Sequence, residues 1–196
     1  MFKSSPEFRA FQRERRGCNS GDPENKKYLA PQPGMRFLDG GSCANLASYR
    51  LDKWPSRYYG VDISPRLIHA MKEFAAREHI TIGGFWLADI ADLPFEDNFF
   101  DIGAVIGVFE YCPLSYIGMA LRELNRVLKP DGRVVLDFPN LDHPHIETMF
   151  RLEEYLGRPN VANPKAPFEQ FLTSLFSIER IDASRLMLKY FLRRLR

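Results

Sequence analysis

Residues 35–47 have the pattern of a buried strand that passes through a tight turn into a helix. Met35 to Leu38 form a short apolar run, Asp39 follows it, and small residues then lead to Leu46. A turn of this kind presents unpaired backbone N–H groups at a helix start, where they can hold a polar ligand. We therefore expect residues 35–47 to form the cofactor-binding corner of an α/β domain.

The alternation of strand and helix continues along the chain. Ser64 and Pro65 form a typical helix start, with a serine N-cap before proline at the first helical position. Residues 100–106 form a continuous apolar run, which is typical of a parallel strand buried on both faces. Strands that alternate with helices predict a doubly wound α/β fold with a mostly parallel sheet. The expected strands cover 35–38, 58–62, 85–88, 100–106, 133–138, 176–181 and 186–192, and the expected helices about 44–51, 64–77, 115–128, 146–156 and 168–175.

The end of the chain departs from this alternation. Only a few residues separate the expected strands 176–181 and 186–192, which permits a hairpin but not a parallel crossover. The chain is therefore expected to end in an antiparallel pair. Residues 186–196 also fit a basic amphipathic helix at a membrane surface, but the short link favours a strand.

The 196 residues suit a single domain. Residues 35–196 are predicted to form this domain, with a long connection at 139–175. Residues 1–34 are polar and basic, and we expect an N-terminal arm. This arm is either a loose surface segment or a flap over a ligand site, with Tyr28 as its contact.

Composition excludes several classes of function. The net charge of +2 gives no support for a nucleic-acid partner, and no apolar run has the length of a membrane helix. The N-terminus lacks the apolar core of a signal peptide. The three cysteines are scattered and show no metal-ligand spacing. We expect a cytoplasmic protein without a bound metal.

Three carboxylates follow three successive strands: Asp39, Asp62 and Asp89. A single aspartate after a strand usually serves a turn or a helix cap. Three of them at one edge of a parallel sheet indicate a ligand laid across the strand ends. Because carboxylates only accept hydrogen bonds, Asp62 suits ribose hydroxyls, Asp39 an amino group and Asp89 a heterocyclic amine.

Ordered blocks with matching spacing extend over residues 35–139. They resemble the class I S-adenosylmethionine-dependent methyltransferases, close to the methyltransferase type 11 group of small-molecule enzymes. The resemblance implies a Rossmann-like sheet of seven strands in the order 3-2-1-4-5-7-6, whose last strand in sequence is reversed. It also implies methyl transfer from S-adenosylmethionine to a small-molecule acceptor, with S-adenosylhomocysteine as product. The matching blocks are Phe37–Ser42, Tyr59–Ser64, Ala88–Phe95, Phe100–Ile102, Val108–Tyr111 and Glu123–Gly132.

The resemblance also implies the cofactor contacts. Asp39, Gly40 and Gly41 would meet the methionine part of S-adenosylmethionine. Asp62 would hold the ribose, and Ile63 would lie against the adenine.

Two further pairs of residues complete the implied cofactor site. Asp89 and the backbone of Ile90 would read the adenine edge. Ile106 and Gly107, just past the fourth strand, would approach the methionine amino group.

The first loop departs from the family pattern. Cys43 and Asn45 stand where the family usually has glycine. This departure keeps open a catalytically silent, methyltransferase-like module that binds a partner protein. A nicotinamide-dependent oxidoreductase is a further alternative, but it needs a Gly-x-Gly-x-x-Gly loop, which this chain lacks.

Two residues are candidates for catalysis. The segment 107–113 lacks the motifs of nucleic-acid amino and cytosine-C5 methyltransferases and the acids of magnesium-dependent catechol-type enzymes. Tyr111 stands where many family members have histidine, and it either orients the acceptor or serves as a packing aromatic. His143 lies in the connection that borders the acceptor pocket in similar enzymes, and it is a candidate general base. The alternatives for residues 140–147 are a polar loop that caps the next helix, or a metal site.

Overall fold

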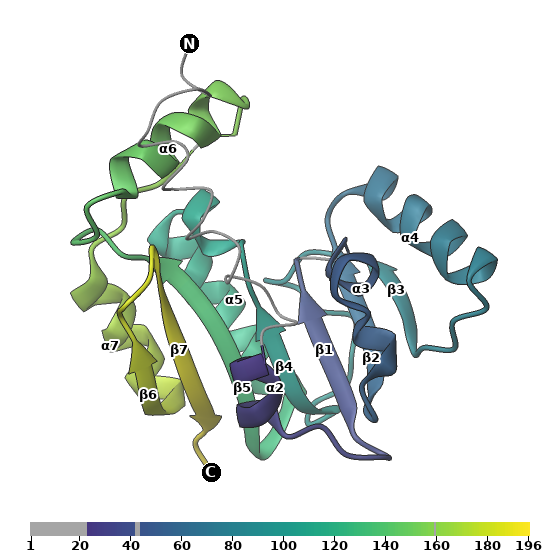
Figure 1. The fold of residues 1–196 in the computed structure, drawn as a ribbon. Coiled ribbons are helices and arrows are strands. Elements are labelled where there is room, and N and C mark those ends of the chain that lie inside the picture. The colour runs from purple at the N-terminus through teal and green to yellow at the C-terminus, as the bar shows by residue number, and fades with distance from the viewer. Residues whose placement is uncertain (1–22, 42–43, 159) are drawn as a thin grey trace.

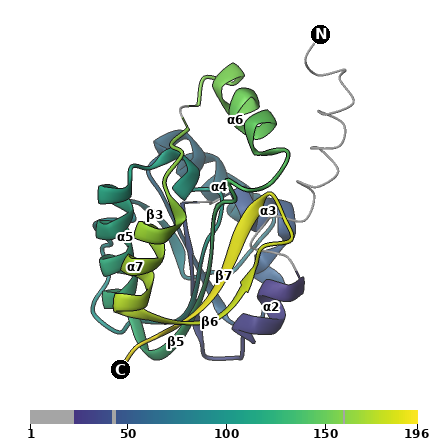
Figure 2. The same cartoon turned by 90° about the vertical axis from the view of Figure 1, so that its left-hand side faces the viewer.

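A computed structural model describes residues 23–41, 44–158 and 160–196. A central sheet lies between two layers of helices (Figure 1). Helices α2, α3 and α4 cover one face, and helices α5 and α7 cover the other (Figure 2). Helix α6 lies beyond the edge at which the parallel strands end (Figures 1 and 2).

The sheet has seven strands in the order β3-β2-β1-β4-β5-β7-β6. Strand β7 is antiparallel to both of its neighbours, whereas the other pairs are parallel. The predicted strand order and the terminal antiparallel pair are therefore confirmed. The strands are β1 Arg36–Gly40, β2 Arg57–Asp62, β3 Gly84–Leu87, β4 Phe100–Val105, β5 Leu128–Pro139, β6 Phe176–Asp182 and β7 Met187–Arg194.

Strand β5 begins five residues earlier than the sequence predicts, at Leu128 rather than residue 133. The sequence predicts a turn at residues 129–132, between helix and strand. Instead the β4–β5 register shifts between Phe100 and Ile102, and Asp131 has a left-handed backbone with φ of 62°. Residues 129–132 therefore contain the predicted turn residues, but these cause an irregularity within β5 and do not mark the beginning of that strand.

Helix boundaries follow local signals closely. The Ser64 hydroxyl accepts a hydrogen bond from the amide of Leu67 at 3.3 Å, which confirms the N-cap of α4. Helix α7 begins at Lys165, earlier than the expected residue 168. The helix can include Pro167, because this residue lies in the first turn, where a missing N–H group costs no helical hydrogen bond. The helices are α2 Pro23–Leu29, α3 Ala44–Tyr49, α4 Pro65–Arg77, α5 Leu114–Val127, α6 Ile146–Tyr155 and α7 Lys165–Leu175, with short 3-10 helices at Leu51–Lys53 and Phe109–Tyr111.

Alternating side chains of the strands form a separate core on each face of the sheet. Leu38 and Leu136 belong to the core beneath α5 and α7, where the rings of Phe138 and Phe168 stack at 3.9 Å. Phe37 belongs to the opposite core, beneath α3 and α4. Since successive side chains of a strand point to opposite faces, both faces of β1 are buried, as expected for a central parallel strand.

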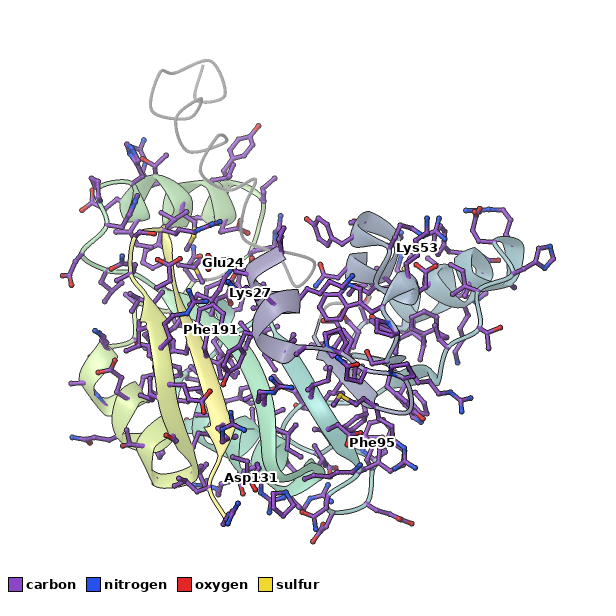
Figure 3. The ribbon with its side chains drawn as sticks, turned by 60° about the horizontal axis from the view of Figure 1, so that its bottom comes forward. Glu24, Lys27, Lys53, Phe95, Asp131 and Phe191 are labelled. Atoms are coloured by element: carbon purple, nitrogen blue, oxygen red, sulfur yellow. The ribbon has the colours of Figure 1, made fainter. Side chains whose placement is uncertain are left out.

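Helix α2 lies on the face of the sheet next to β5 and β7, where Glu24, Lys27 and Phe191 lie close together (Figure 3). The Tyr28 ring packs edge-on against Phe191 at 5.1 Å, and its hydroxyl donates to Glu179 at 2.9 Å. Tyr28 therefore covers β7 and is not placed at the strand-end edge, where a flap would make its contact. Residues 1–22 of the predicted arm lie outside the described residues.

None of the helices that the structure describes is long and apolar enough to span a bilayer. In residues 187–194, where the sequence also permits an amphipathic helix, the chain forms strand β7. This result confirms the hairpin interpretation.

Candidate functional site

The turn after β1 depends on glycine at position 41. Gly41 has φ of 77°, which disfavours any residue with a side chain. A Cβ atom on Gly41 would also lie 2.5 Å from Cγ2 of Val108. Because Val108 belongs to the loop after β4, the absent side chain lets these two loops meet at the strand-end edge.

The structure describes only one of the two residues, Cys43 and Asn45, that replace the family's usual glycines. Cys43, together with Ser42, lies outside the described residues. Asn45 lies in the first turn of α3 and is buried, and it does not have the positive φ that favours glycine. A side chain at position 45 is therefore compatible with this backbone.

Asp39 is fully buried near the end of β1. Its Oδ2 atom accepts a hydrogen bond from the Tyr58 hydroxyl of β2 at 2.9 Å. The strand register sets Asp39 level with Gly60 on β2 and Ala104 on β4. Tyr58 therefore orients this carboxylate from the neighbouring strand.

The register relates the three predicted carboxylates to one another. Asp62 lies two residues beyond Gly60, so its side chain is on the same face of the sheet as that of Asp39. Asp62 is level with Leu87 on β3, and Asp89 follows two residues beyond Leu87. From β1 to β3, each successive acid thus lies about two residues further toward the carboxyl ends of the strands.

Asp62 combines a hydrogen-bond acceptor with an apolar neighbour. Its Oδ1 atom accepts from the Ser64 amide at 2.8 Å, and no other described residue donates to its Oδ2. Ile63, the next residue, is 69% exposed, which is unusual for a large aliphatic side chain. An accepting oxygen beside an open apolar surface suits a ribose joined to a flat heterocycle.

Asp89 is exposed and is held by two donors. Its Oδ1 atom accepts from the Ala91 amide at 2.8 Å and from the Tyr116 hydroxyl at 2.5 Å. Burial and the bond to Asp89 raise the pKa of Tyr116, so its hydroxyl stays a donor. Sequence reasoning missed Tyr116, because it treated residues 115–128 only as an amphipathic helix. Ile90, the other predicted residue here, is buried.

The loop after β4 begins with Ile106, which is buried, and Gly107, which is exposed and has φ of 75°. The Gly107 amide donates to Oδ1 of Asp137 on β5 at 2.9 Å. Asp137 was also missed by sequence reasoning. The available signal was a carboxylate within the apolar run of residues 133–138, since a buried charge requires polar partners.

A cavity of about 70 Å³ opens next to Gly107. Its lining residues come from the end of β5, the loop and 3-10 helix after β4, the start of β7, and helix α6. Figure 1 shows where these elements lie relative to one another. The walls of the cavity combine carboxylates with apolar side chains. The lining residues are Gly107, Glu110, Asp137, Met149, Glu153, Leu186 and Met187.

Tyr111 contacts one wall of this cavity. Its hydroxyl donates to Oε2 of Glu153 at 3.0 Å, and the same oxygen is 3.0 Å from Nε of Arg158. Burial, together with the charges of Glu110 and Glu153, raises the pKa of the Tyr111 hydroxyl. Tyr111 is thus a donor that positions Glu153, and its own hydroxyl is already engaged.

His143 lies in the turn that precedes α6. Its Nδ1 atom accepts from the His145 amide at 3.2 Å, and its own amide donates to the Asn140 carbonyl. A nitrogen that already accepts a hydrogen bond is poorly placed to take up a proton. The residues that line the cavity do not include His143. Across the described parts of the chain, no group of three His, Cys, Asp or Glu residues is arranged to hold a metal ion.

The sequence matches one family model. The family model described as "Methyltransferase domain" matches residues 38–136, which is half of the chain. The matched stretch extends from β1 into β5.

Curated relatives have names that refer to quinones. A 2-phytyl-1,4-naphtoquinone methyltransferase of Trichormus variabilis is 33% identical over 128 residues, which are 62% of this chain and 55% of that protein. A demethylmenaquinone methyltransferase of Tropheryma whipplei is 29% identical over 170 residues, which are 83% of this chain and 68% of that protein. The chain thus spans only about half the length of the first of these relatives.

Solved structures share the fold. The PH0226 protein from Pyrococcus horikoshii OT3 matches with a TM-score of 0.75 and 21% identity, over 98% of this chain and 93% of that chain. A geranyl diphosphate C-methyltransferase from Streptomyces coelicolor A3(2), in complex with Mg²⁺, geranyl diphosphate and S-adenosyl-L-homocysteine, matches with a TM-score of 0.70 and 13% identity, over 86% of this chain and 76% of that chain. At such identities the similarity concerns the fold alone.

Proposed function

The chain belongs to the methyltransferase domain family, and from this membership we propose that it transfers a methyl group from S-adenosylmethionine to a small-molecule acceptor. The observation that carries the proposal is the edge formed by Gly41, Asp62 and Gly107. Each of these residues ends or follows a neighbouring parallel strand, which is where ligands bind on such sheets.

The residues at this edge fit S-adenosylmethionine. Asp62 would accept from the ribose hydroxyls through Oδ2, and the exposed Ile63 would cover the adenine. Asp89, oriented by Tyr116, and the backbone of Ile90 would face the adenine edge.

The methionine part would lie closer to the centre of the sheet. Gly40 and Gly41 would pass beneath it, with Asp39 behind them and Ile106 and Gly107 on the side of β4. When bound, S-adenosylmethionine supplies a methyl group on a positively charged sulfur, so the protein mainly positions the reactants and excludes water.

We further propose that the acceptor is a reduced quinone or a related dihydroxy aromatic. The names of the two quinone methyltransferase relatives support this class. The cavity beside Gly107 also supports it, because carboxylates and the apolar side chains of Met149 and Met187 share its walls. Such walls suit a polar substituent of an acceptor whose apolar ring lies outside the cavity.

Calorimetric titration with S-adenosylhomocysteine tests the proposed cofactor. The wild-type protein should bind it and should not bind NAD. Asp62→Ala should abolish detectable binding because the ribose loses its acceptor. Glu96→Ala, which removes an exposed carboxylate from the loop after the Asp89 turn, is the matched control and should bind normally.

Two outcomes would contradict the proposal. Failure of the wild-type protein to bind S-adenosylhomocysteine at millimolar concentration would leave the binding-only module as the better interpretation. Wild-type affinity in Asp62→Ala would show that the ribose site is wrongly assigned.

A further inference from the structure

Asp137 is a carboxylate in a strand that is otherwise apolar. It is only 2% exposed, near the carboxyl end of β5. Its Oδ1 atom accepts from the Gly107 amide at 2.9 Å, and no other described residue donates a hydrogen bond to its Oδ2. Asp137 lines a cavity, and a carboxylate oxygen there can accept a hydrogen bond from a group that enters it. This oxygen is therefore suited to a ligand group that donates a hydrogen bond.

The surroundings of Asp137 provide space for such a group. Asp137 lines the cavity of about 70 Å³, which has room for about two water molecules. One polar substituent of an acceptor would fit there, whereas a whole ring would have to remain outside. Gly107 belongs both to this cavity and to the proposed cofactor site, so the substituent would lie beside the methyl donor.

The charges around the cavity favour a neutral donor. Lys189 lies directly opposite Asp137 in the β5–β7 register and is itself only 2% exposed. Glu153 is paired with Arg158 at 3.0 Å. Glu110 is a third carboxylate in the wall of the cavity, so a negatively charged ligand would be repelled, whereas a hydroxyl group donates a hydrogen bond without adding charge.

The acidity of Asp137 suits proton transfer. Burial raises the pKa of its carboxyl group to about 6, although the Gly107 amide and the positive charge of Lys189 oppose this shift. The group is therefore mostly ionised at pH 7 and is a stronger base than an exposed aspartate.

We propose that this cavity receives a hydroxyl group of the acceptor and that Asp137 accepts its proton. The inference rests on the proposed methyl transfer. The O–H bond of the acceptor breaks, its proton goes to Oδ2 of Asp137, and its electron pair stays on the acceptor as the nucleophile. The acceptor gains the methyl group, and the sulfur of the departing thioether keeps the electron pair of the broken C–S bond.

Binding of two matched probes to the S-adenosylhomocysteine complex tests the inference under anaerobic conditions. The first probe, 1,4-naphthohydroquinone, donates hydrogen bonds. The second, 1,4-difluoronaphthalene, has the same skeleton and no O–H group. The wild-type protein should bind the hydroquinone at least about tenfold more tightly, because hydrogen bonds to charged acceptors are strong.

Asp137→Asn should remove this preference, since the amide keeps an oxygen for Gly107 but replaces the other acceptor with a donor. Glu154→Gln is the matched control, because Glu154 is the exposed neighbour of Glu153 on α6. It should keep the preference. S-adenosylhomocysteine binding by Asp137→Asn should equal that of the wild type, which would show that the variant is folded.

The wild-type protein also provides a test that needs no variant. The preference for the hydroquinone should fall between pH 7.5 and pH 5, as Asp137 becomes protonated. An equal affinity for both probes, a preference that survives in Asp137→Asn, or a preference that does not change with pH would overturn the inference alone. Failure to bind S-adenosylhomocysteine would instead overturn the proposed function, and the inference with it.

Discussion

The amide of Gly107 donates a hydrogen bond to Oδ1 of Asp137 at 2.9 Å, and this bond joins the loop after β4 to the adjacent strand β5. It aligns the carboxylate at the boundary between the proposed cofactor site and the cavity. The bond also anchors the backbone of Gly107, which is exposed and has φ of 75°. Gly107 and Asp137 therefore fix the position of this boundary together.

The stability of the protein should reflect the burial of Asp137. Its pKa in the folded state is about 6, above the ordinary value of 3.8, so its contribution to stability is full below pH 3.8 and is lost as the pH rises through 6. This loss corresponds to about 3 kcal/mol. Asp137→Asn has no such titration. Its free energy of unfolding relative to wild type should therefore rise by up to about 3 kcal/mol between pH 4 and pH 7.

Urea unfolding of the two proteins at several pH values measures this change. The comparison with Asp137→Asn cancels the titration of other carboxylates. A difference between the two proteins that stays constant from pH 4 to pH 7 would contradict the raised pKa.

Gly41→Ala should impair both folding and cofactor binding. The new Cβ would lie 2.5 Å from Val108, at a φ of 77°. The backbone strain alone is worth about 1–2 kcal/mol. Gly157→Ala is a matched control, because Gly157 has φ of 72° and no atom lies within 4 Å of the position that its new methyl group would occupy. We expect a lower melting temperature in both variants, a larger decrease in Gly41→Ala, and loss of S-adenosylhomocysteine binding only there. Equal effects would show that contact with Val108 is unimportant.

Tyr116→Phe should weaken cofactor binding without unfolding the protein. The variant removes the hydroxyl that orients Asp89 at 2.5 Å. Loss of one hydrogen bond is worth about 0.5–1.5 kcal/mol, so the dissociation constant for S-adenosylhomocysteine should rise about two- to tenfold. Tyr49→Phe, which alters an exposed tyrosine on α3, should have no effect. Unchanged affinity in Tyr116→Phe would exclude Asp89 orientation as a determinant of binding.

Tyr111→Phe tests whether the Tyr111 hydroxyl positions Glu153. The Tyr111 hydroxyl donates to Glu153, which is only 2% exposed, so its loss should lower the free energy of unfolding by about 1 kcal/mol. A double-mutant cycle with Glu153→Gln should show coupling between the two side chains. S-adenosylhomocysteine affinity should remain at the wild-type value. Full additivity of the two substitutions would contradict this contact.

Local patterns in the sequence were sufficient to predict the helices, the strands and the α/β class, whereas the strand order was implied by the resemblance to a known family. The helix that starts at Ser64 and the strand at 100–105 were predicted with nearly the observed bounds. Their signals lie within a few residues of one another, because a side chain caps its own helix and hydrophobic periodicity repeats along one element. The terminal hairpin followed from the length of one link.

Side-chain contacts between distant segments were not predictable in the same way. The sequence indicated the acids at 39, 62 and 89 but not their partners Tyr58 and Tyr116, which other elements supply. The sequence named Tyr111 and His143 as catalytic candidates but did not indicate their contacts: the Tyr111 hydroxyl donates to Glu153, and His143 accepts a hydrogen bond within its own turn.

The sequence by itself determined the order of strands and helices and the edge at which a ligand can bind, because these depend on local hydrogen bonding and on the pattern of apolar residues. Only the tertiary structure decided which polar groups share the cavity beside Gly107. Asp137, Glu153 and Met187 are widely separated along the chain, and they meet because β7 returns antiparallel to β5 while α6 packs above the strand ends. No local sequence pattern predicts that these three residues lie together, since their proximity depends on the packing of the whole sheet.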